Sequence, residues 1–215
     1  MLDANPGVSL VSSARLLIDA ESNVVRIQAP FRGDYMTKGT DVINKCLYMQ
    51  KNLIGEPSTV MFRRGQSARG FNENYTHIVD LEMWFHLLEQ GKFAYLSEPL
   101  SAFRVHPDQQ TAVNRRDLRR VEDMFHLLED YVNKPYVDLG KVFKRYLEYR
   151  QVHEIWKLYV KKHIGRRPAF DIIDRRWGIA GFFLLLPLYG VFRHLLKARI
   201  ALGNALDRHP FWDVT

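Results

Sequence analysis

The residue types best suited to chemistry gather between positions 52 and 111 of this 215-residue chain. Asp80 and Glu82 stand at the start of a predicted helix, and a carboxylate can accept a proton from a reacting hydroxyl. His106 follows a predicted strand, and imidazole is a competent ligand for a divalent metal. Each residue also has an ordinary structural use: aspartate caps helices, Glu82 can be a solvated helix-face carboxylate, and surface loops often contain histidine.

Three arginines in the same block are suited to binding anions. Arg63 and Arg64 follow one predicted strand, and Arg104 lies in another. A guanidinium group matches the geometry of phosphate oxygens, so these side chains could face a diphosphate. The alternative is that they are solvated charges at strand ends.

Short strands and short helices alternate along the first half of the chain. The apolar patterns predict one or two short strands over residues 8–18, further strands over residues 59–62, 93–96 and 102–105, and helices over residues 40–51 and 81–88. Thr40 is the expected N-cap of the first helix, residues 30–39 read as a loop, and Pro99 is expected to break the last strand. This alternation favours an α/β layer over a helical bundle.

Four features of residues 52–111 resemble, in order and spacing, the bacterial family-2 glycosyltransferases of GT-A fold that build surface polysaccharides. GEPS at 55–58, followed by a strand and two arginines, resembles the mid-sheet segment of that family, and GFNE at 70–73 is similar to its GGFDE loop. DLEMW at 80–84 resembles its acidic helix start, and EPL at 98–100 through FRVH at 103–106 resembles its closing strand. Four matches in register argue against chance.

The resemblance implies an inverting, hexosyltransferase-type enzyme with Asp80 as the catalytic base. The residues implied to contact the acceptor or substrate are Glu82, Gly70, Phe71, Trp84 and Arg104. His106 is similar in place to a histidine that completes the site of a divalent metal, magnesium or manganese, on the donor diphosphate. The family's glutamate before the base is Val79 here. Since a neighbouring negative charge raises the pKa of a carboxyl group, we expect less to hold up the pKa of Asp80.

The resemblance covers about residues 2–111 and begins midway through the GT-A fold, since residues 2–18 resemble the segment after the family's metal-binding DXD strand. Asp3 and Asp19 form no DXD arrangement, and no donor role is carried onto them. We therefore expect a partial GT-A (Rossmann-like) mixed sheet with flanking helices and an exposed edge. The nucleotide-sugar-binding half and its metal would lie outside this chain, which by itself should transfer little or no sugar.

Two functions follow from this reading. The full-length enzyme would transfer a sugar from a nucleotide-sugar donor to a lipid-linked or polysaccharide acceptor, with this chain as its acceptor-side portion. The alternative is a non-catalytic interaction protein, a partner subunit or decayed remnant, which docks through its open edge onto a donor-binding chain or forms a homo-oligomer.

The second half of the chain differs in charge and in pattern. Residues 1–110 carry 11 Lys and Arg against 12 Asp and Glu, whereas residues 111–215 carry 20 against 12, so the basic character belongs to the second half alone. Amphipathic patterns over residues 118–132 and 142–160 predict an all-α extension, which Gly165 and Pro168 interrupt. We place the boundary between domains 1–110 and 111–215 near residues 107–114.

A basic surface attracts phosphate in nucleic acid, anionic lipid or a lipid-linked pyrophosphate. No helix-turn-helix, zinc or RNA-binding signature accompanies the charge, which argues against nucleic acid. Residues 177–192, WGIAGFFLLLPLYGVF, are apolar and flanked by arginines. They could lie in a membrane interface, form a buried helix pair or, less suitably for their length, span a bilayer.

The start of the chain has no secretory pattern, because the first residues are polar and turn-like. The single cysteine, Cys46, sits among apolar residues at helical spacing and is expected in the core. These features predict a cytoplasmic protein, peripheral on the inner face of the membrane if the apolar segment lies in the interface.

Overall fold

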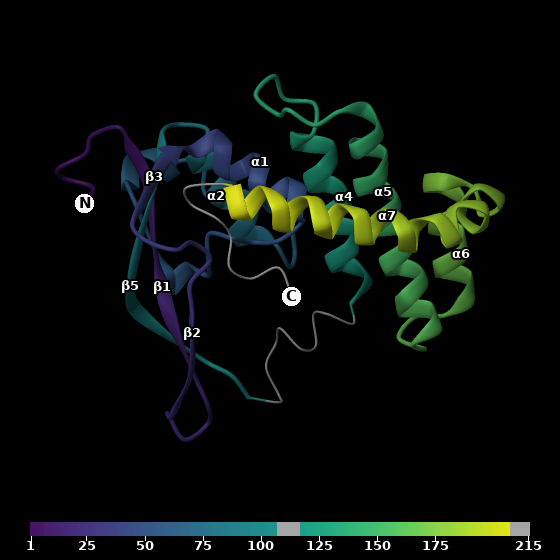
Figure 1. Cartoon of the computed structure of the whole chain (residues 1–215), viewed down its shortest axis with the longest axis horizontal. Helices are drawn as coiled ribbons and strands as arrows, with labels where there is room; N and C mark the ends of the chain where they lie inside the picture. Colours follow the sequence, from purple (N-terminus) through teal and green to yellow (C-terminus); the bar gives the residue numbers. More distant parts are fainter. Residues whose placement is uncertain (107–116, 207–215) are drawn as a thin grey trace. The chain divides into compact units, whose positions relative to one another are not determined.

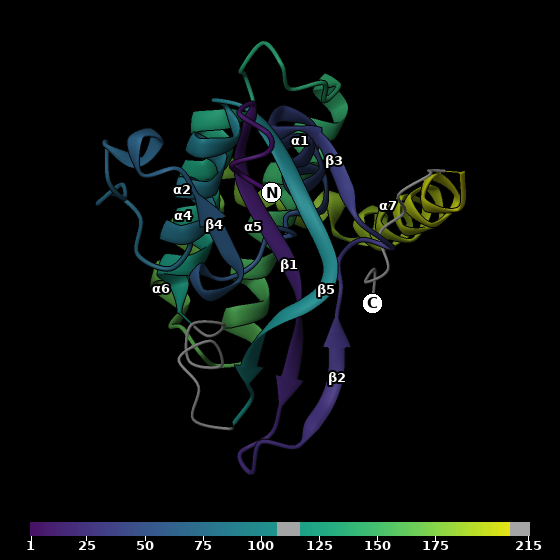
Figure 2. The ribbon, with the colours of Figure 1, turned by 90° about the vertical axis from the view of Figure 1, so that its left-hand side faces the viewer.

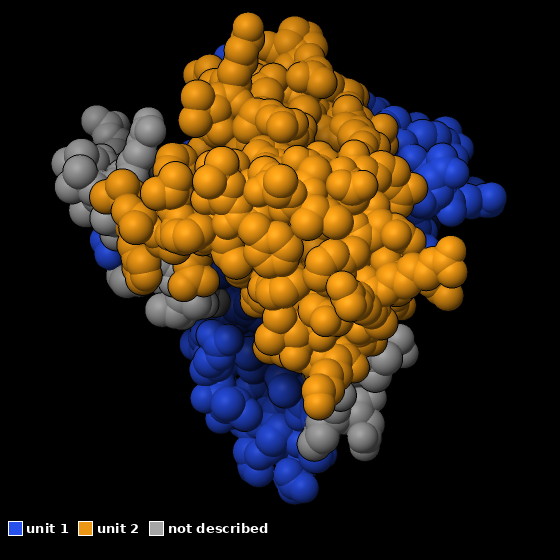
Figure 3. Space-filling model, turned by 90° about the vertical axis from the view of Figure 1, so that its right-hand side faces the viewer, with its two compact units in different colours: residues 1–109, 204–215 blue, residues 110–203 orange. Residues whose placement is uncertain are grey.

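The computed structural model describes residues 1–106 and 117–206, with side chains described as far as residue 195. The chain divides into two compact units, residues 1–109 with 204–215 and residues 110–203 (Figure 3). The predicted boundary near residues 107–114 lies outside the described residues.

The first unit is built on a curled mixed sheet (Figures 1 and 2). β1 (Val8–Ile18) is its centre and pairs in parallel with β5 (Lys92–Arg104). On its other side β1 pairs antiparallel with both β2 (Val24–Gln28) and β4 (Val60–Phe62). β3 (Tyr35–Lys38) pairs antiparallel with β5. The α/β class and the mixed sheet are therefore confirmed.

Residues 8–18, predicted as one or two short strands, form one continuous strand. Every residue from Val8 to Ala14 is buried, including three serines that interrupt the apolar pattern. Their hydroxyls donate hydrogen bonds to backbone carbonyls, for example from Ser9 to Lys92 at 3.3 Å and from Ser13 to Ala14 at 2.9 Å. A satisfied hydroxyl can be buried at little cost, so the strand continues through them.

Two other predictions were wrong in detail, and one strand was not predicted. β2 is exposed along most of its length and carries no buried pattern, so no strand was predicted there, and β3 lies inside the stretch predicted as loop. Pro99 does not break β5: the register with β1 passes from Leu96 to Pro99 between consecutive residues of β1, so the extra residues form an irregularity. β3 pairs with β5 over Lys92–Tyr95, so at Pro99 the described pairing of β5 is with β1 alone, and a proline is tolerated on such a one-sided stretch.

Helices α1 (Gly39–Met49) and α2 (Val79–Leu88) pack against each other and against the sheet. α1 begins one residue before the predicted Thr40 cap, with Lys38 at the N-cap and no side-chain cap bond. The Gly39 amide donates to the Gly91 carbonyl at 3.0 Å, and a Cβ at Gly39 would lie 2.1 Å from the Leu88 carbonyl oxygen. Only glycine fits where the start of α1 meets the end of α2.

The core of the first unit lies between these helices and the sheet. Phe31 stacks on Tyr35 at 5.0 Å between centroids and contacts Tyr95 at the same distance. Cys46 of α1 is buried in this core, which confirms the sequence prediction, and burial raises the pKa of its thiol to about 12.

The described part of the second unit consists of α4 (Leu118–Tyr131), α5 (Lys141–Val160), α6 (Arg166–Trp177) and α7 (Ile179–Leu206). Gly165 is the N-cap of α6, and Pro168 falls in its first turn, where a missing amide hydrogen costs nothing. Gly178, at φ 79°, separates α6 from α7. The predicted apolar segment 177–192 thus begins at the last residue of α6 and continues as the first half of α7.

Aromatic rings fill the space between α5 and α7. Tyr149 stacks on Phe182 at 5.4 Å and donates its hydroxyl to the Phe182 carbonyl at 2.8 Å. Tyr149 also contacts Tyr189, at 5.4 Å between centroids. Among the described residues no single helix is long and apolar enough to cross a membrane, although α6 with residues 179–195 of α7 passes as a pair bent by 86°.

Candidate active site around Asp80

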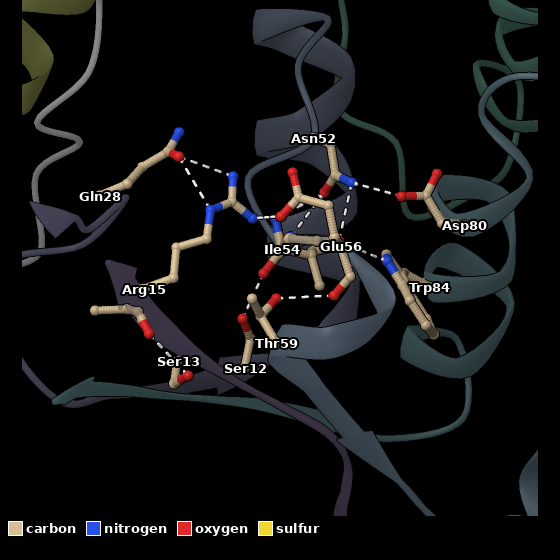
Figure 4. Close-up of polar contacts among 12 residues, drawn as sticks. Ser12, Ser13, Arg15, Gln28, Asn52, Ile54, Glu56, Thr59, Asp80 and Trp84 are labelled. Carbon is tan, nitrogen blue, oxygen red and sulfur yellow. Dashed lines mark hydrogen bonds and ion pairs between the residues drawn. The ribbon is translucent and has the colours of Figure 1, made fainter. Parts of the chain in front are cut away.

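Asp80 is the second residue of α2 and its carboxylate is half-buried beside the loop formed by residues 52–56 (Figure 4). One carboxylate oxygen accepts from the Leu81 amide at 2.8 Å, and the other accepts from the Asn52 side-chain amide at 3.3 Å. Burial raises the pKa of Asp80, and the Leu81 bond opposes this shift. Desolvation is the largest cause of this rise, and the neighbouring position 79 is a valine, which supplies no charge.

Asn52 gives the loop its shape. Its side-chain oxygen accepts from the amides of Ile54 and Gly55, both at 3.0 Å, while its side-chain nitrogen donates to the Gly55 carbonyl at 3.1 Å as well as to Asp80. Gly55 adopts φ 124°, a conformation that side chains rarely allow. One side chain thus folds the loop and contacts the candidate base.

The central strand holds the other side of this loop. The Ser12 hydroxyl donates to the Ile54 carbonyl, and Arg15 forms an ion pair with Glu56 (Figure 4). The Arg15 guanidinium also donates twice to the Gln28 side-chain oxygen, at 3.0 and 2.9 Å. The sequence predicted no role for Ser12, Arg15 or Gln28; the signal available for this loop was the GEPS motif, which contains Glu56.

Trp84 lies in the core behind Asp80. It is 1% exposed, its ring contacts Phe62 at 5.7 Å, and its indole nitrogen donates to the Gly55 carbonyl at 2.9 Å. A side chain so buried positions the loop, and the structure gives it no surface on which to contact an acceptor.

Glu82 also points into the protein. Its carboxylate is 3% exposed and forms two bonds with the Arg69 guanidinium, at 2.8 and 2.7 Å. This pair anchors the segment that leads to Gly70, which adopts φ 75°, and Phe71, which is half-exposed. Of the predicted acceptor-contacting residues in α2 and this loop, Phe71 is the one whose large side chain is accessible.

The arginines predicted to face a diphosphate bind the chain's own backbone. Arg63 donates to the carbonyls of Leu2 at 2.6 Å and Val8 at 3.3 Å. Arg104 donates to the carbonyls of Asp19 and Ala20, both at 2.8 Å. Both arginines fasten the ends of β1 and have no need of a phosphate. Arg64 begins the short 3-10 helix η2 (Arg64–Ser67).

His106 is exposed at the end of the first described range. Across residues 1–106 and 117–195, no group of three His, Cys, Asp or Glu side chains could hold a metal ion. Asp19 uses its carboxylate to accept from Asn23 in the β1–β2 turn, at 2.8 and 3.1 Å. The divalent metal is thus implied by the resemblance alone, and the described residues do not supply a ligand set for it.

No protein-family model matches the chain, and the comparisons with curated proteins and with solved structures return no match either. The fold and the contacts therefore define a mixed α/β protein with a structured polar site at Asp80.

Proposed function

We propose that this chain provides the acceptor-side wall and the general base of an inverting family-2 glycosyltransferase. The complete enzyme transfers a hexose-type sugar from a nucleotide-sugar donor to a lipid-linked or polysaccharide acceptor. The proposal is supported by the Asp80 carboxylate, which is half-buried in the first turn of α2 and oriented by Asn52 of the loop that carries the GEPS match.

In this reaction Asp80 takes the proton from the acceptor hydroxyl as the hydroxyl oxygen attacks the anomeric carbon. The bond from that carbon to the diphosphate oxygen breaks, and the nucleotide leaves with the electron pair. A carboxylate whose pKa is raised by burial is a stronger base than an exposed one, which suits this transfer. Asn52 and Trp84 act as positioning residues because both bind Gly55.

We derive no step for the metal, and we assign no described side chain to the departing diphosphate. The described arginines at 63 and 104 are bound to backbone carbonyls, and no described ligand cluster is present. Sugar transfer needs electrostatic stabilisation of the leaving group, so we expect the purified chain alone to give no detectable transfer from a panel of radiolabelled sugar nucleotides. Efficient transfer by this chain would contradict that expectation.

The acceptor site is tested by NMR titration of the labelled chain with oligosaccharides and, separately, with sugar nucleotides. We expect the saccharides to shift the Gly55 amide, the Leu81 amide and the Trp84 indole signals, and Asp80→Asn to weaken that binding. Asp41→Asn is the matched control, since Asp41 also lies in the first turn of a helix and bonds Thr37 at 2.6 Å. Shifts that avoid the Asp80 loop, or equal losses in both variants, would remove the proposal.

A second candidate function is docking onto a separate donor-binding chain. The observation that favours it is β2, a strand at the end of the sheet order whose Val24, Val25 and Ile27 are all more than half exposed. An exposed strand with apolar side chains is a template for pairing with another chain. In-frame codons for a DXD-bearing segment immediately upstream of Met1 would instead make both halves one polypeptide and eliminate this candidate.

A further inference from the structure

Helix α7 is apolar on two opposite faces. Phe182 and Tyr189, seven residues apart, are buried against α5. The opposite face carries Leu184, Leu188, Val191 and Leu195, which recur at i, i+4, i+7 and i+11 and are between 60% and 76% exposed. A surface helix normally turns polar residues to water. This stripe therefore indicates that α7 contacts a second apolar environment besides α5.

A groove adjoins the stripe. It has a volume of about 240 Å³, lies between α5, the end of α6 and α7, and shares Leu188 with the stripe. Apart from Arg145, its lining side chains are uncharged, and they include Val142, Tyr146, Trp177 and Phe192. Val142 is itself 74% exposed, so the apolar surface extends from α7 onto α5.

Cationic groups accompany this apolar surface. The Arg145 guanidinium lies 4.1 Å from the centre of the Trp177 ring and its side chain is 62% exposed. A neighbouring cavity of about 300 Å³ shares Arg145 and adds Lys144, Arg175 and Arg176. Glu148 pairs with Arg145, and Glu129 pairs with Arg176. The cavity is thus lined by four cationic side chains and two carboxylates.

We infer that the α7 stripe and the α5–α7 groove, together the α7 apolar face, lie on an anionic lipid bilayer. Leucine and valine side chains enter the hydrocarbon boundary, Trp177 lies at headgroup depth, and Arg145 with its neighbours meets lipid phosphates. The bend of 86° between α6 and α7 suits a helix that lies in the interface plane. A second copy of the chain is a poorer occupant, because residues 111–215 carry 20 basic against 12 acidic residues and two copies would repel.

The test is flotation of the full chain with vesicles of phosphatidylcholine or of equimolar phosphatidylcholine and phosphatidylglycerol. We expect binding to the anionic vesicles that falls with added salt, because exposed charges are screened. Val191→Gln should weaken the partition constant about fivefold, and Leu184→Gln with Leu188→Gln on the order of a hundredfold. Arg145→Gln should weaken binding to anionic vesicles about fivefold.

Val160→Gln is the matched control. Val160 is 57% exposed at the end of α5, whereas Val191 is 60% exposed on the stripe. Equal flotation of these two variants, with unchanged helical circular dichroism, would overturn the inference, as would equal binding to neutral and anionic vesicles. A dimer in analytical ultracentrifugation that Val191→Gln dissociates, without vesicle binding by the parent chain, would assign the face to a second copy. Because flotation needs no sugar nucleotide, its outcome is independent of the proposed role of Asp80.

Discussion

The Asp80 loop and the α7 apolar face differ in opposite ways from the usual distribution of polar and apolar side chains. At the loop, the polar side chains of Ser12 and Glu82 are buried and bind partners inside the protein, and the exposed Asn52 binds the loop itself. On α7, apolar side chains turn outward. Buried polar residues and exposed apolar patches are the informative exceptions in a globular protein, even where a hydrogen bond, as at Ser12, makes the burial inexpensive. The two units therefore carry different signals of function: buried polar contacts in the first unit and an exposed apolar face in the second.

The arginines show the same contrast. In the first unit Arg63 and Arg104 hold backbone carbonyls, and Arg69 neutralises a buried glutamate. In the second unit Arg145 lies over an aromatic ring with its side chain mostly exposed, and Arg167 is 93% exposed. The arginines named in the first unit therefore bind groups within the protein, whereas Arg145 and Arg167 in the second unit are largely exposed.

The largest effect is expected from Gly39→Ala, which breaks the first region alone. The new methyl group would meet the carbonyl oxygens of Leu88 and Gly91 at 2.1 and 2.6 Å, and backbone atoms cannot rotate away. We expect a loss of about 3 kcal/mol in the free energy of unfolding, measured by urea denaturation. Gly33→Ala is the control, because no atom lies within 4 Å of its added carbon. Equal stability of the two variants would show that α1 and α2 can separate.

The next largest effect on stability is expected from breaking the Arg69–Glu82 ion pair of the first unit. Its counterpart in the second unit is the Arg145–Glu148 pair, and the nitrogen–oxygen distance is 2.7 Å in both. Arg69→Met leaves the buried Glu82 without its arginine and should cost about 3 kcal/mol of stability, most of which Glu82→Leu in the same chain should restore. Arg145→Met breaks a pair exposed on both sides and should cost less than about 1 kcal/mol. Thermal melts of the four chains check this order, and an equal cost for both arginines would erase the contrast.

Asp80→Asn should change the pH dependence of stability. Burial places the pKa of Asp80 above its unfolded value, so its contribution to stability is present at low pH and is lost as pH rises through the folded pKa. The variant lacks this loss. Its stability relative to the parent should therefore increase from about pH 4 towards neutrality and then level off. Urea unfolding across this range measures the difference; a decrease with rising pH would mean that the ionised form is the favoured one.

The smallest effect sharpens the comparison from the other side. Val191→Gln should alter the free energy of unfolding by less than about 0.5 kcal/mol, because the side chain is exposed and its loss leaves no cavity. A fall of several kcal/mol in a thermal melt would mean that the stripe is covered within the protein, in contradiction to an outward role.

The sequence predicted elements where a local pattern decides the structure. The helix expected over residues 81–88 is α2, because its apolar positions Leu81, Trp84, Phe85 and Leu88 recur at helical spacing and are buried. β2 could not be found in this way, since its stability comes from hydrogen bonds to β1 and its side chains are exposed. Pro99 misled for a related reason: whether a proline ends a strand depends on the neighbouring register, which is not local.

The candidate site was predicted in the same uneven way. The position of Asp80 in the first turn of a helix follows from nearby residues and is confirmed, whereas its bond to Asn52 joins residues 28 apart in sequence. Arg63 and Arg104 looked like anion-binding residues because the carbonyls that they bind belong to distant turns. The residue type indicated which kinds of group an arginine can bind. The fold determines which of these groups lies within reach.

The burial of Cys46 provides a built-in reporter for the first unit. It is the sole cysteine in the sequence and is 2% exposed, and burial raises the pKa of its thiol to about 12. At neutral pH almost none of the thiol is therefore ionised, and maleimide or iodoacetamide reacts with the thiolate. Alkylation under native conditions must therefore wait for α1 to detach from the sheet. The labelling rate reads the opening equilibrium of that helix directly, without any introduced probe.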